Sequence, residues 1–420
     1  MSPYRRVFAA LLVITPILYI YWRKFTVPEA LIGFRGHAAT EDVFNNTLGF
    51  SKIFVINLPS RTDRRDRMSL AGAVSNLSFT WIDGVPGDQV SDQIVPGGAK
   101  GHSVGAKGSW RSHMNALQAV VGENLESALI MEDDVDWDVR LKSQLQTFAS
   151  ASRGWLRESR SDKKQPDLLN FAPPSPFGRR DSAATGVEES ERNTIQLSAV
   201  TRTDGDTQNV FGDGWDVLWL GHCGADLPDE QSQVSPLKIT IPDDETVPAP
   251  KHLKPHPFSL PDKLGDVYPP HTRVVHASSG NVCSLAYAVS KQGARKLLWE
   301  FSVKFDSQWD LMLQKWCEGG YVAKEGDSQT SHDRDGDEDI HYPRRNDTPV
   351  CLTVQPPLIS HHYPKGSASD IQGEGGGYAK GIGTPYIRLS VQENLQHLIV
   401  GALEGEMVDQ LPDNGKTIWK

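Results

Sequence analysis

The segment from Ser127 to Asp138 reads SALIMEDDVDWD, and this stretch decides the fold. Its apolar run stops abruptly at a cluster of five carboxylates, which are Glu132, Asp133, Asp134, Asp136 and Asp138. A continuous apolar run of this length is typical of a strand covered on both faces of a sheet. We therefore expect a central strand that delivers several carboxylates to one edge of the sheet.

Strand and helix patterns alternate around this segment. KIFVINL (Lys52 to Leu58) has the pattern of a second buried strand, and LSFTWIDG (Leu77 to Gly84) that of a third. GSWRSHMNALQAVVGEN (Gly108 to Asn124) has apolar residues at helical spacing and leads directly into the carboxylate strand. The alternation predicts an α/β fold with a mostly parallel central sheet.

The rest of the chain alternates between regular and irregular stretches. Further strands are expected at Gly214 to Gly224, Asn281 to Ser290 and Val350 to His362, with a helix (KQGARKLLWEF) after Ser290. Polar or proline-rich composition predicts insertions near 172–209, 225–270 and 326–347. We expect one folded domain over 48–400 and a tail over 401–420.

The N-terminus has the composition of a membrane segment. Arg5 and Arg6 precede the uncharged stretch VFAALLVITPILYIYW (Val7 to Trp22), which ends in aromatic residues suited to a membrane interface rather than in a cleavage site. The sequence therefore predicts a signal anchor over 1–25 and a stem over 26–47. Its short span suits the thin membranes of the endoplasmic reticulum or Golgi, with a single pass and the large domain in the lumen.

Charge and cysteine content narrow the possible partners and location. The 43 basic and 53 acidic residues give a net charge of −10, which disfavours nucleic acid or an anionic membrane as the main partner. Glycosylation sequons begin at Asn45, Asn76 and Asn346, as a lumenal location would allow. The four cysteines at 223, 283, 317 and 351 permit two disulfides in three connectivities, and buried free thiols are the alternative.

Carboxylates this close repel one another unless a cation compensates their charge. Their position beyond a strand end therefore indicates a divalent metal, because carboxylate oxygens suit Mg²⁺, Mn²⁺ or Ca²⁺. A calcium loop beginning at Asp134 is excluded, since Val139 and Leu145 stand where that loop needs glycine and glutamate. Asp136 is a weaker metal candidate, and Asp138 is expected to be solvated or to cap the following helix.

A cluster of arginines follows the first strand. Arg61, Arg64, Arg65 and Arg67 begin a helix that Ser60 or Thr62 can cap, and guanidinium groups with backbone N–H groups suit a diphosphate. The alternative is an exposed helix whose arginines pair with neighbouring aspartates. Neither a G-x-G-x-x-G motif after a strand nor a P-loop motif occurs.

Four motifs together resemble glycosyltransferase family 25 in order and spacing. They are INLPSRTDRRDRM, WIDG, SHMNALQAVVGENLESALIMEDDV and AYAVSKQGARKLL. The resemblance covers residues 50–137 well and 214–320 more loosely, and the insertions and anchor look more like those of a fungal member. It implies a GT-A-type nucleotide-sugar-binding fold, a divalent metal (usually Mn²⁺, with Mg²⁺ as the alternative) and transfer with inversion at the anomeric carbon.

The resemblance also implies roles for particular positions. Donor-binding residues would be Asn57, Arg61, Arg64, Arg65, Asp83, Gly84, Ser112, His113 and Asp133. Glu132 and Asp134 would bind the metal. From its position after VQPPLIS, and not from the resemblance, we expect His361 or His362 to supply a late metal ligand or contact the diphosphate, with His361 preferred. Asp310 in SQWDLMLQKW matches a family aspartate and is the expected catalytic base, with Asp306 as its competitor. A carboxylate that only stabilises a helix start is the alternative for Asp310.

These observations predict a metal-dependent inverting glycosyltransferase that moves a hexose, foremost galactose, from a UDP-sugar to a hydroxyl of a glycan, glycoprotein or glycolipid acceptor. A leaving diphosphate develops negative charge that a metal and guanidinium groups can stabilise. A glycoside hydrolase also uses paired carboxylates but has no need of the arginine cluster. A catalytically silent sugar- or nucleotide-binding protein would keep the fold and lack the base.

Overall fold

The computed structural model describes residues 41–97, 101–161, 193–200, 209–253, 263–321, 348–363 and 383–417. The strands are β1 (Lys52–Asn57), β2 (Phe79–Asp83), β3 (Ser127–Glu132), β4 (Val135–Trp137), β5 (Thr194–Gln196), β6 (Val217–Gly221), β7 (Lys238–Ile241), β8 (Arg273–Ala277), β9 (Ala286–Ser290), β10 (Cys351–Gln355) and β11 (Ile359–His361). The helices are α2 (Thr62–Val74), α3 (Val104–Gly122), α4 (Leu141–Ser161), α6 (Leu264–Val267), α7 (Lys291–Val303), α8 (Trp309–Cys317) and α9 (Leu395–Ile399).

The strands form one mixed sheet in the order β2-β1-β3-β9-β6-β10-β8-β7-β5, with β11 pairing β4 and β6. Parallel pairs join β1 to β2 and β3, β6 to β10 and β11, and β5 to β7. Equally many strand pairs are antiparallel. In these pairs β9 runs against β3 and β6, β8 runs against β7 and β10, and β4 runs against β11. The α/β class is confirmed, but the expected parallel majority is not found among the described strands. Burial on both faces gives an apolar run whatever the strand direction.

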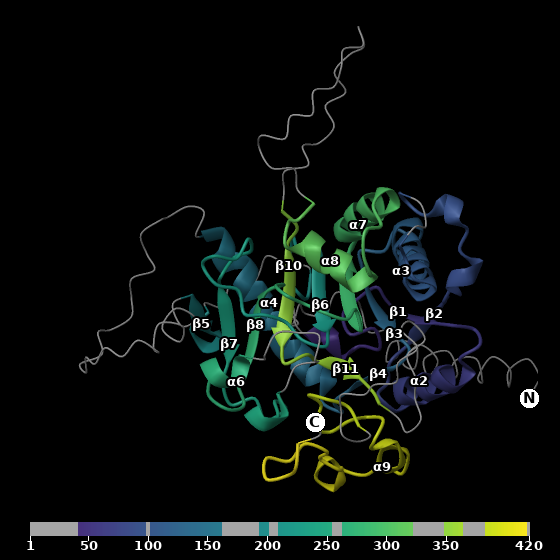
Figure 1. Cartoon of the computed structure of the whole chain (residues 1–420). Coiled ribbons are helices and arrows are strands. Elements are labelled where there is room, and N and C mark those ends of the chain that lie inside the picture. The colour runs from purple at the N-terminus through teal and green to yellow at the C-terminus, as the bar shows by residue number, and fades with distance from the viewer. Residues whose placement is uncertain are drawn as a thin grey trace, which may run out of the picture.

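Helices cover both faces of the sheet. Alternate strand residues such as Phe54, Ile130 and Tyr287 face α3, α7 and α8, which Figure 1 shows gathered together above the β1–β3 region. The residues between them, such as Val55 and Leu129, pack with residues of α2 and α4 on the opposite face. Each face therefore has its own apolar core, and the strand ends carry the polar groups.

Two helix starts differ from the expectation. α2 begins at Thr62 with Arg61 as its cap residue, and no side chain caps it, so the predicted Ser60 or Thr62 cap is wrong. α3 begins at Val104, capped by the hydroxyl of Ser103, which accepts a 3.1 Å hydrogen bond from the Ala106 N–H. Gly108 lies inside this helix because a Cβ there would meet the Val85 carbonyl oxygen at 2.6 Å. The glycine thus marks close helix–loop packing, not a helix start.

All four cysteines are paired in disulfides. Cys223, after β6, is bonded to Cys283, before β9, and Cys317, at the end of α8, to Cys351, at the start of β10. This connectivity is one of the three that the sequence allows, and the free-thiol alternative is wrong. The predicted insertion near 225–270 was also incomplete as a description, since it contains β7 and α6.

Residues 1–40 lie outside the described part of the chain, and so do the predicted anchor and most of the predicted stem. Most of the 172–209 insertion and the 326–347 insertion lie outside it as well. Among the described residues, none of the helices combines the length and apolar character needed to cross a bilayer.

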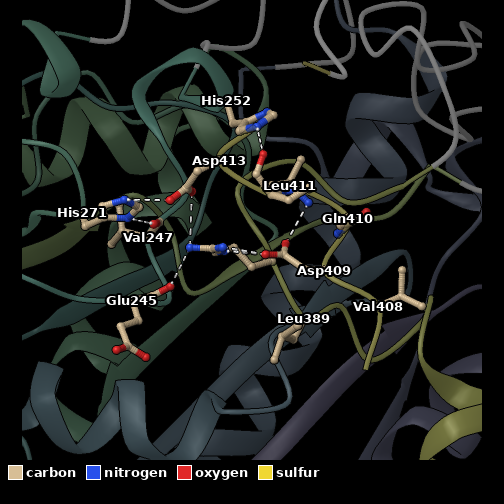
Figure 2. Close-up of polar contacts among 12 residues, drawn as sticks. Glu245, Val247, His252, His271, Leu389, Val408, Asp409, Gln410, Leu411 and Asp413 are labelled. Carbon is tan, nitrogen blue, oxygen red and sulfur yellow. Dashed lines mark hydrogen bonds and ion pairs between the residues drawn. The ribbon is translucent and has the colours of Figure 1, made fainter. Parts of the chain in front are cut away.

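The segment 383–417 packs against the loops around β8. Arg388 donates to the carboxylate of Asp409 at 2.6 Å and to the carbonyl of Glu245, and His271 lies 3.2 Å from Asp413 (Figure 2). Leu411, within the predicted tail, is completely buried. The C-terminal residues up to 417 are therefore attached to the domain.

Candidate functional site

The ends of β1 and β3 meet through a buried amide–carboxylate pair. The Asn57 Nδ2 group donates to Asp133 Oδ2 at 2.7 Å, and Arg64 Nη1 donates to Asp133 Oδ1 at 2.7 Å. The parallel register of the two strands brings these residues together beyond the strand ends. Burial raises the pKa of Asp133, as does the neighbouring Asp134, while Arg64 and Asn57 act in the opposite direction.

Asp134 lies between Arg64 and His361. Its Oδ2 atom is 2.9 Å from Arg64 Nη1 and 3.3 Å from His361 Nε2. The pairing of β11 with β4 places His361 there, and the His362 N–H donates to the Asp134 carbonyl at 2.9 Å. Burial favours a higher pKa for Asp134, but His361 and Arg64 outweigh it, and the pKa lies well below its ordinary value.

Two buried polar atoms of this pair lack partners among the described residues. Asp134 Oδ1 and His361 Nδ1 are buried, and within the described part of the chain neither has a hydrogen-bond partner. A buried polar atom without a partner is costly, and a cation would satisfy the carboxylate oxygen. A carboxylate together with an imidazole suits Mn²⁺ better than Mg²⁺, which prefers oxygen ligands.

Glu132 faces the other side of the sheet. Its Oε1 atom accepts a 3.0 Å hydrogen bond from the Ser284 hydroxyl and lies 4.0 Å from His113 Nε2. Burial, followed by the charge of Asp134, raises the pKa of Glu132 to about 8. In the described residues no three histidine, cysteine, aspartate or glutamate side chains converge on one point. The predicted metal set of Glu132, Asp134 and His361 is therefore not preassembled, because Glu132 turns toward Ser284.

His113 is a buried, neutral member of an aromatic group. Its ring stacks on Trp309 at 4.7 Å between centroids, and its Nδ1 atom lies 3.0 Å from the Tyr287 hydroxyl oxygen. Burial lowers the pKa of His113 to about 3. It thus forms a neutral wall beside Glu132 and orients the start of α8.

Asp310 lies in the first turn of α8, where the Cys283 N–H donates to its Oδ2 atom at 2.8 Å. Burial raises its pKa, and its charge contributes to the raised pKa of Glu132, so the two carboxylates lie within electrostatic reach. Asp306 instead accepts hydrogen bonds from Lys315 and Tyr321 on the surface. The structure brings Asp310, and not Asp306, to the carboxylate end of β3.

The predicted arginine cluster is divided. Arg64 reaches the carboxylates, whereas Arg61 forks onto Asp63 at 2.9 Å and the Arg65 guanidinium lies 4.6 Å from the centroid of the Trp81 ring. Arg67 lies close enough to lower the pKa of His362, whose burial has the larger effect. The positive charge at the site comes from Arg64 directly and from Arg67 at longer range.

Asp83 ends β2, Gly84 begins the turn after it, and Ser112 of α3 packs against this turn. The Ser112 hydroxyl donates to the Gly108 carbonyl at 2.7 Å and accepts from the Val85 N–H at 2.8 Å, so it holds α3 against this turn. The Gly84 N–H donates to the Asn57 carbonyl at 2.8 Å, and Asp83 is exposed. Asp83 is therefore available at the rim of the site, whereas Gly84 is buried and both its N–H and the Ser112 hydroxyl are already engaged.

The last two carboxylates of the opening stretch serve the structure. Asp136 accepts hydrogen bonds from Thr384 and Ser390, and Asp138 binds Arg140 and the Leu389 N–H. Both side chains are fully buried, so the expectation of a solvated Asp138 is wrong, although it does accept from the Arg140 N–H just before α4. Of their partners, Thr384, Leu389 and Ser390 lie in the segment 383–417, about which no motif in the sequence gave information.

Sequence reasoning missed two residues of the site. Ser284 and Tyr287 flank the start of β9 and contact Glu132 and His113. Both lie within the strand that the sequence predicted over Asn281 to Ser290, but pairing of β9 with β3 was needed to place them at the site.

Part of the chain is similar in sequence to proteins of one known family. Residues 50–183 match the sequence model of glycosyltransferase family 25, described as an LPS biosynthesis protein. Procollagen galactosyltransferase 1 of Danio rerio is 24% identical over 214 residues, which are 48% of this chain and 31% of that protein. Procollagen galactosyltransferase 2 of Homo sapiens is 29% identical over 115 residues, 24% of this chain and 18% of that protein.

A further relative bears on activity. Inactive glycosyltransferase 25 family member 3 of Homo sapiens is 29% identical over 153 residues, which are 33% of this chain and 24% of that protein. The chain therefore spans less than a third of the length of each of these three relatives.

Proposed function

Residues 50–183 belong to glycosyltransferase family 25, and from this premise we propose that the protein is a metal-dependent inverting transferase of a hexose from a UDP-sugar. The observation that supports it most is the arrangement beyond β1 and β3, where Arg64 spans Asp133 and Asp134 and His361 contacts Asp134. The mixed α/β sheet with polar strand ends is consistent with a GT-A-like fold.

Asp134 and His361 would hold the metal, because they carry the buried atoms that lack partners among the described residues. Few protein ligands suffice at such a site, since substrate phosphates commonly complete the coordination of Mg²⁺ or Mn²⁺. When bound, the metal would stabilise the negative charge of the leaving diphosphate.

The other side chains position the donor. Asn57 fixes Asp133, and Arg64 supplies a guanidinium whose charge suits a diphosphate. Asp83 and Gly84 at the adjacent turn are proposed to contact the uridine part. Arg61 and Arg65 could join only by leaving Asp63 and Trp81.

Asp310 is the proposed base. It would accept the proton of the acceptor hydroxyl as that oxygen bonds to the anomeric carbon, and the glycosyl–phosphate bond breaks on the opposite face. A raised pKa makes the Asp310 carboxylate a stronger base, in the direction that general base catalysis needs. Neutral His113 and the stacked Trp309 hold the start of α8, where Asp310 lies.

Galactose is the proposed sugar because two of the relatives are named as galactosyltransferases. We propose a hydroxyl of a glycan, glycoprotein or glycolipid as acceptor, and the endoplasmic reticulum or Golgi as location, with the N-terminal apolar segment as membrane anchor. The two disulfides agree with an oxidising compartment. A catalytically silent binding protein is the second candidate, because one relative is named inactive.

A turnover assay separates the two candidates. The full chain in detergent is incubated with UDP-galactose, Mn²⁺ and a mixture of glycan, glycoprotein and glycolipid acceptors, and release of UDP is measured. We expect UDP release that depends on Mn²⁺. Asp134→Ala should abolish this release, and Glu126→Gln, a control substitution at an exposed position, should retain it. UDP binding without any release would support the silent candidate, and absence of both would contradict the proposal.

A further inference from the structure

A polar cavity of about 530 Å³ runs along α8, on the side of the helix away from the stacked rings of His113 and Trp309. Its walls come from α8 and the turn after it, from the loop 226–234 and from residues 279–280. Leu311 lines it and directly follows Asp310 in the chain, whereas Glu318 and Gly320 line it beyond the end of α8. The cavity therefore reaches the first turn of α8, in which Asp310 lies, although Asp310 is not one of its lining residues.

One short segment connects this cavity to the site beyond β3. Within residues 280–284, the Gly280 N–H donates to Glu318 at 2.7 Å, the Cys283 N–H donates to Asp310, and Ser284 donates to Glu132. The Cys223–Cys283 disulfide ties this segment to the loop that follows β6. The segment 280–284 thus connects the cavity wall to the carboxylates of the site, and the disulfide restrains this segment.

Asp226 is the distinctive polar group of the cavity. Its carboxylate packs so closely on the segment that a Cβ at Gly280, where φ is +60°, would lie 2.5 Å from Asp226 Oδ2. Within the described part of the chain no group donates a hydrogen bond to this half-buried side chain. Burial raises its pKa and outweighs the opposite effect of the Lys263 charge, so a hydrogen-bond donor from a ligand would be favourable.

The remaining lining combines donors and acceptors. Gln231, Gln233 and Gln314 carry amides, which both donate and accept, and Lys315 donates only. Hydroxyl groups also donate and accept, so a polyhydroxylated ligand matches this mixture, while Val234 and Leu311 offer apolar surface to its C–H groups. An organic ammonium group is the competing ligand, because Asp226 and Glu318 carry carboxylates while the Lys315 ammonium is already paired with Asp306.

We propose that this cavity binds a saccharide unit of the acceptor and presents it beside Asp310. The inference rests on the proposed transferase function, since it assigns the acceptor subsite of the same reaction. It predicts that the acceptor is a glycan or a glycosylated molecule, and not an unmodified peptide.

Saturation-transfer NMR tests the subsite. The full chain, in a zwitterionic detergent without a sugar head group, is titrated with methyl glycosides of galactose, glucose, mannose and xylose, and with n-butylamine. We expect at least one glycoside to bind, and Asp226→Ala to weaken it about tenfold, as loss of a charged hydrogen-bond acceptor implies. Gln233→Ala, from the same wall, should weaken it as well, and Glu230→Gln, an exposed carboxylate of the same loop outside the lining, should not.

Thermal melting of each variant confirms folding, and UDP binding measured in the same samples keeps the two proposals separate. Three results would overturn the subsite while leaving UDP binding intact. They are absence of glycoside binding, glycoside binding that both variants leave unchanged, and binding of butylamine alone. If the wild type does not bind UDP, the proposed function is overturned, and with it the assignment of the bound sugar as an acceptor.

Discussion

Asn57 and Arg64 between them occupy both carboxylate oxygens of Asp133, with Asn57 Nδ2 2.7 Å from Oδ2 and Arg64 Nη1 2.7 Å from Oδ1. Each Asp133 oxygen thus already accepts a hydrogen bond, whereas Asp134 keeps one buried oxygen without a partner among the described residues. Of the two neighbouring aspartates, Asp133 joins the ends of β1 and β3, and Asp134 is the one that we propose as metal ligand.

Arg64→Lys should weaken UDP binding by about tenfold to a hundredfold. A lysine ammonium has fewer donors than the guanidinium, whose Nη1 atom contacts both carboxylates and which we propose also binds the diphosphate. Charged hydrogen bonds contribute about 1.5–3 kcal/mol. Isothermal calorimetry on the full chain measures the change. Arg295→Lys, on α7, is the matched control, and equal affinities of Arg64→Lys and wild type would contradict the assigned role.

Asp310→Asn should lower the turnover number about a hundredfold or more while leaving UDP affinity unchanged, since loss of a general base acts on the chemical step. Asp306→Asn should retain activity, because Asp306 binds Lys315 and Tyr321 away from the site. Steady-state UDP release with both variants measures the effect. Full activity of Asp310→Asn would remove Asp310 from catalysis.

Asp136→Ala should lower the free energy of unfolding by about 3 kcal/mol or more, because it leaves buried donors without an acceptor. Those donors are Thr384 Oγ1, Ser390 Oγ and two backbone N–H groups. Asp413→Ala removes the ion pairs of a half-exposed carboxylate with His271 and Arg388, and it should cost only about 1 kcal/mol. Urea denaturation compares the variants, and similar losses for both would show that the Asp136 network contributes little.

Two buried histidines predict a pH effect on stability. Burial lowers the pKa of His222 to about 4 and that of His276 to about 3, from an ordinary value of 6.5. Below pH 6.5 the unfolded chain therefore binds protons that the folded chain does not, and their contribution to stability falls as the pH drops. From pH 6.5 to 5 each costs about 2 kcal/mol, at 1.36 kcal/mol per pKa unit.

His276→Gln isolates this effect, since Asp136, whose pKa burial raises to about 6, acts in the opposite direction. Urea denaturation at pH 7 and pH 5 should show a smaller loss of stability for the variant than for wild type. Identical losses would mean that His276 takes up its proton in the folded state.

The sequence indicated the elements of the fold better than their directions. The apolar runs identified β1, β3, β6, β9 and β10, because burial on both faces removes the alternation between polar and apolar residues. The same burial hides strand direction, so the antiparallel course of β9 between β3 and β6 could not be predicted. Gly108 misplaced the start of α3, since the contact with Val85 that requires glycine is tertiary.

At the site, the residues adjacent to strand ends were predictable and their partners were not. Asn57, Asp133 and Asp134 followed from two strand ends that parallel pairing brings together. The burial of Asp138 depends on Leu389, which is 251 positions away in the chain, and that of Asp136 depends on Thr384 and Ser390 in the same segment. Contacts of this range leave no local pattern in the sequence.

The central claim is that Asp134 and His361 bind a metal that in turn helps to bind UDP. The most direct measurement is calorimetry of UDP binding to the full chain, with Mn²⁺ and with a chelator, for wild type, Asp134→Ala and the control Glu126→Gln. The account predicts UDP binding that requires Mn²⁺ in wild type and control and that is lost in Asp134→Ala. UDP binding that is equally strong without metal, or that survives in Asp134→Ala, would contradict it.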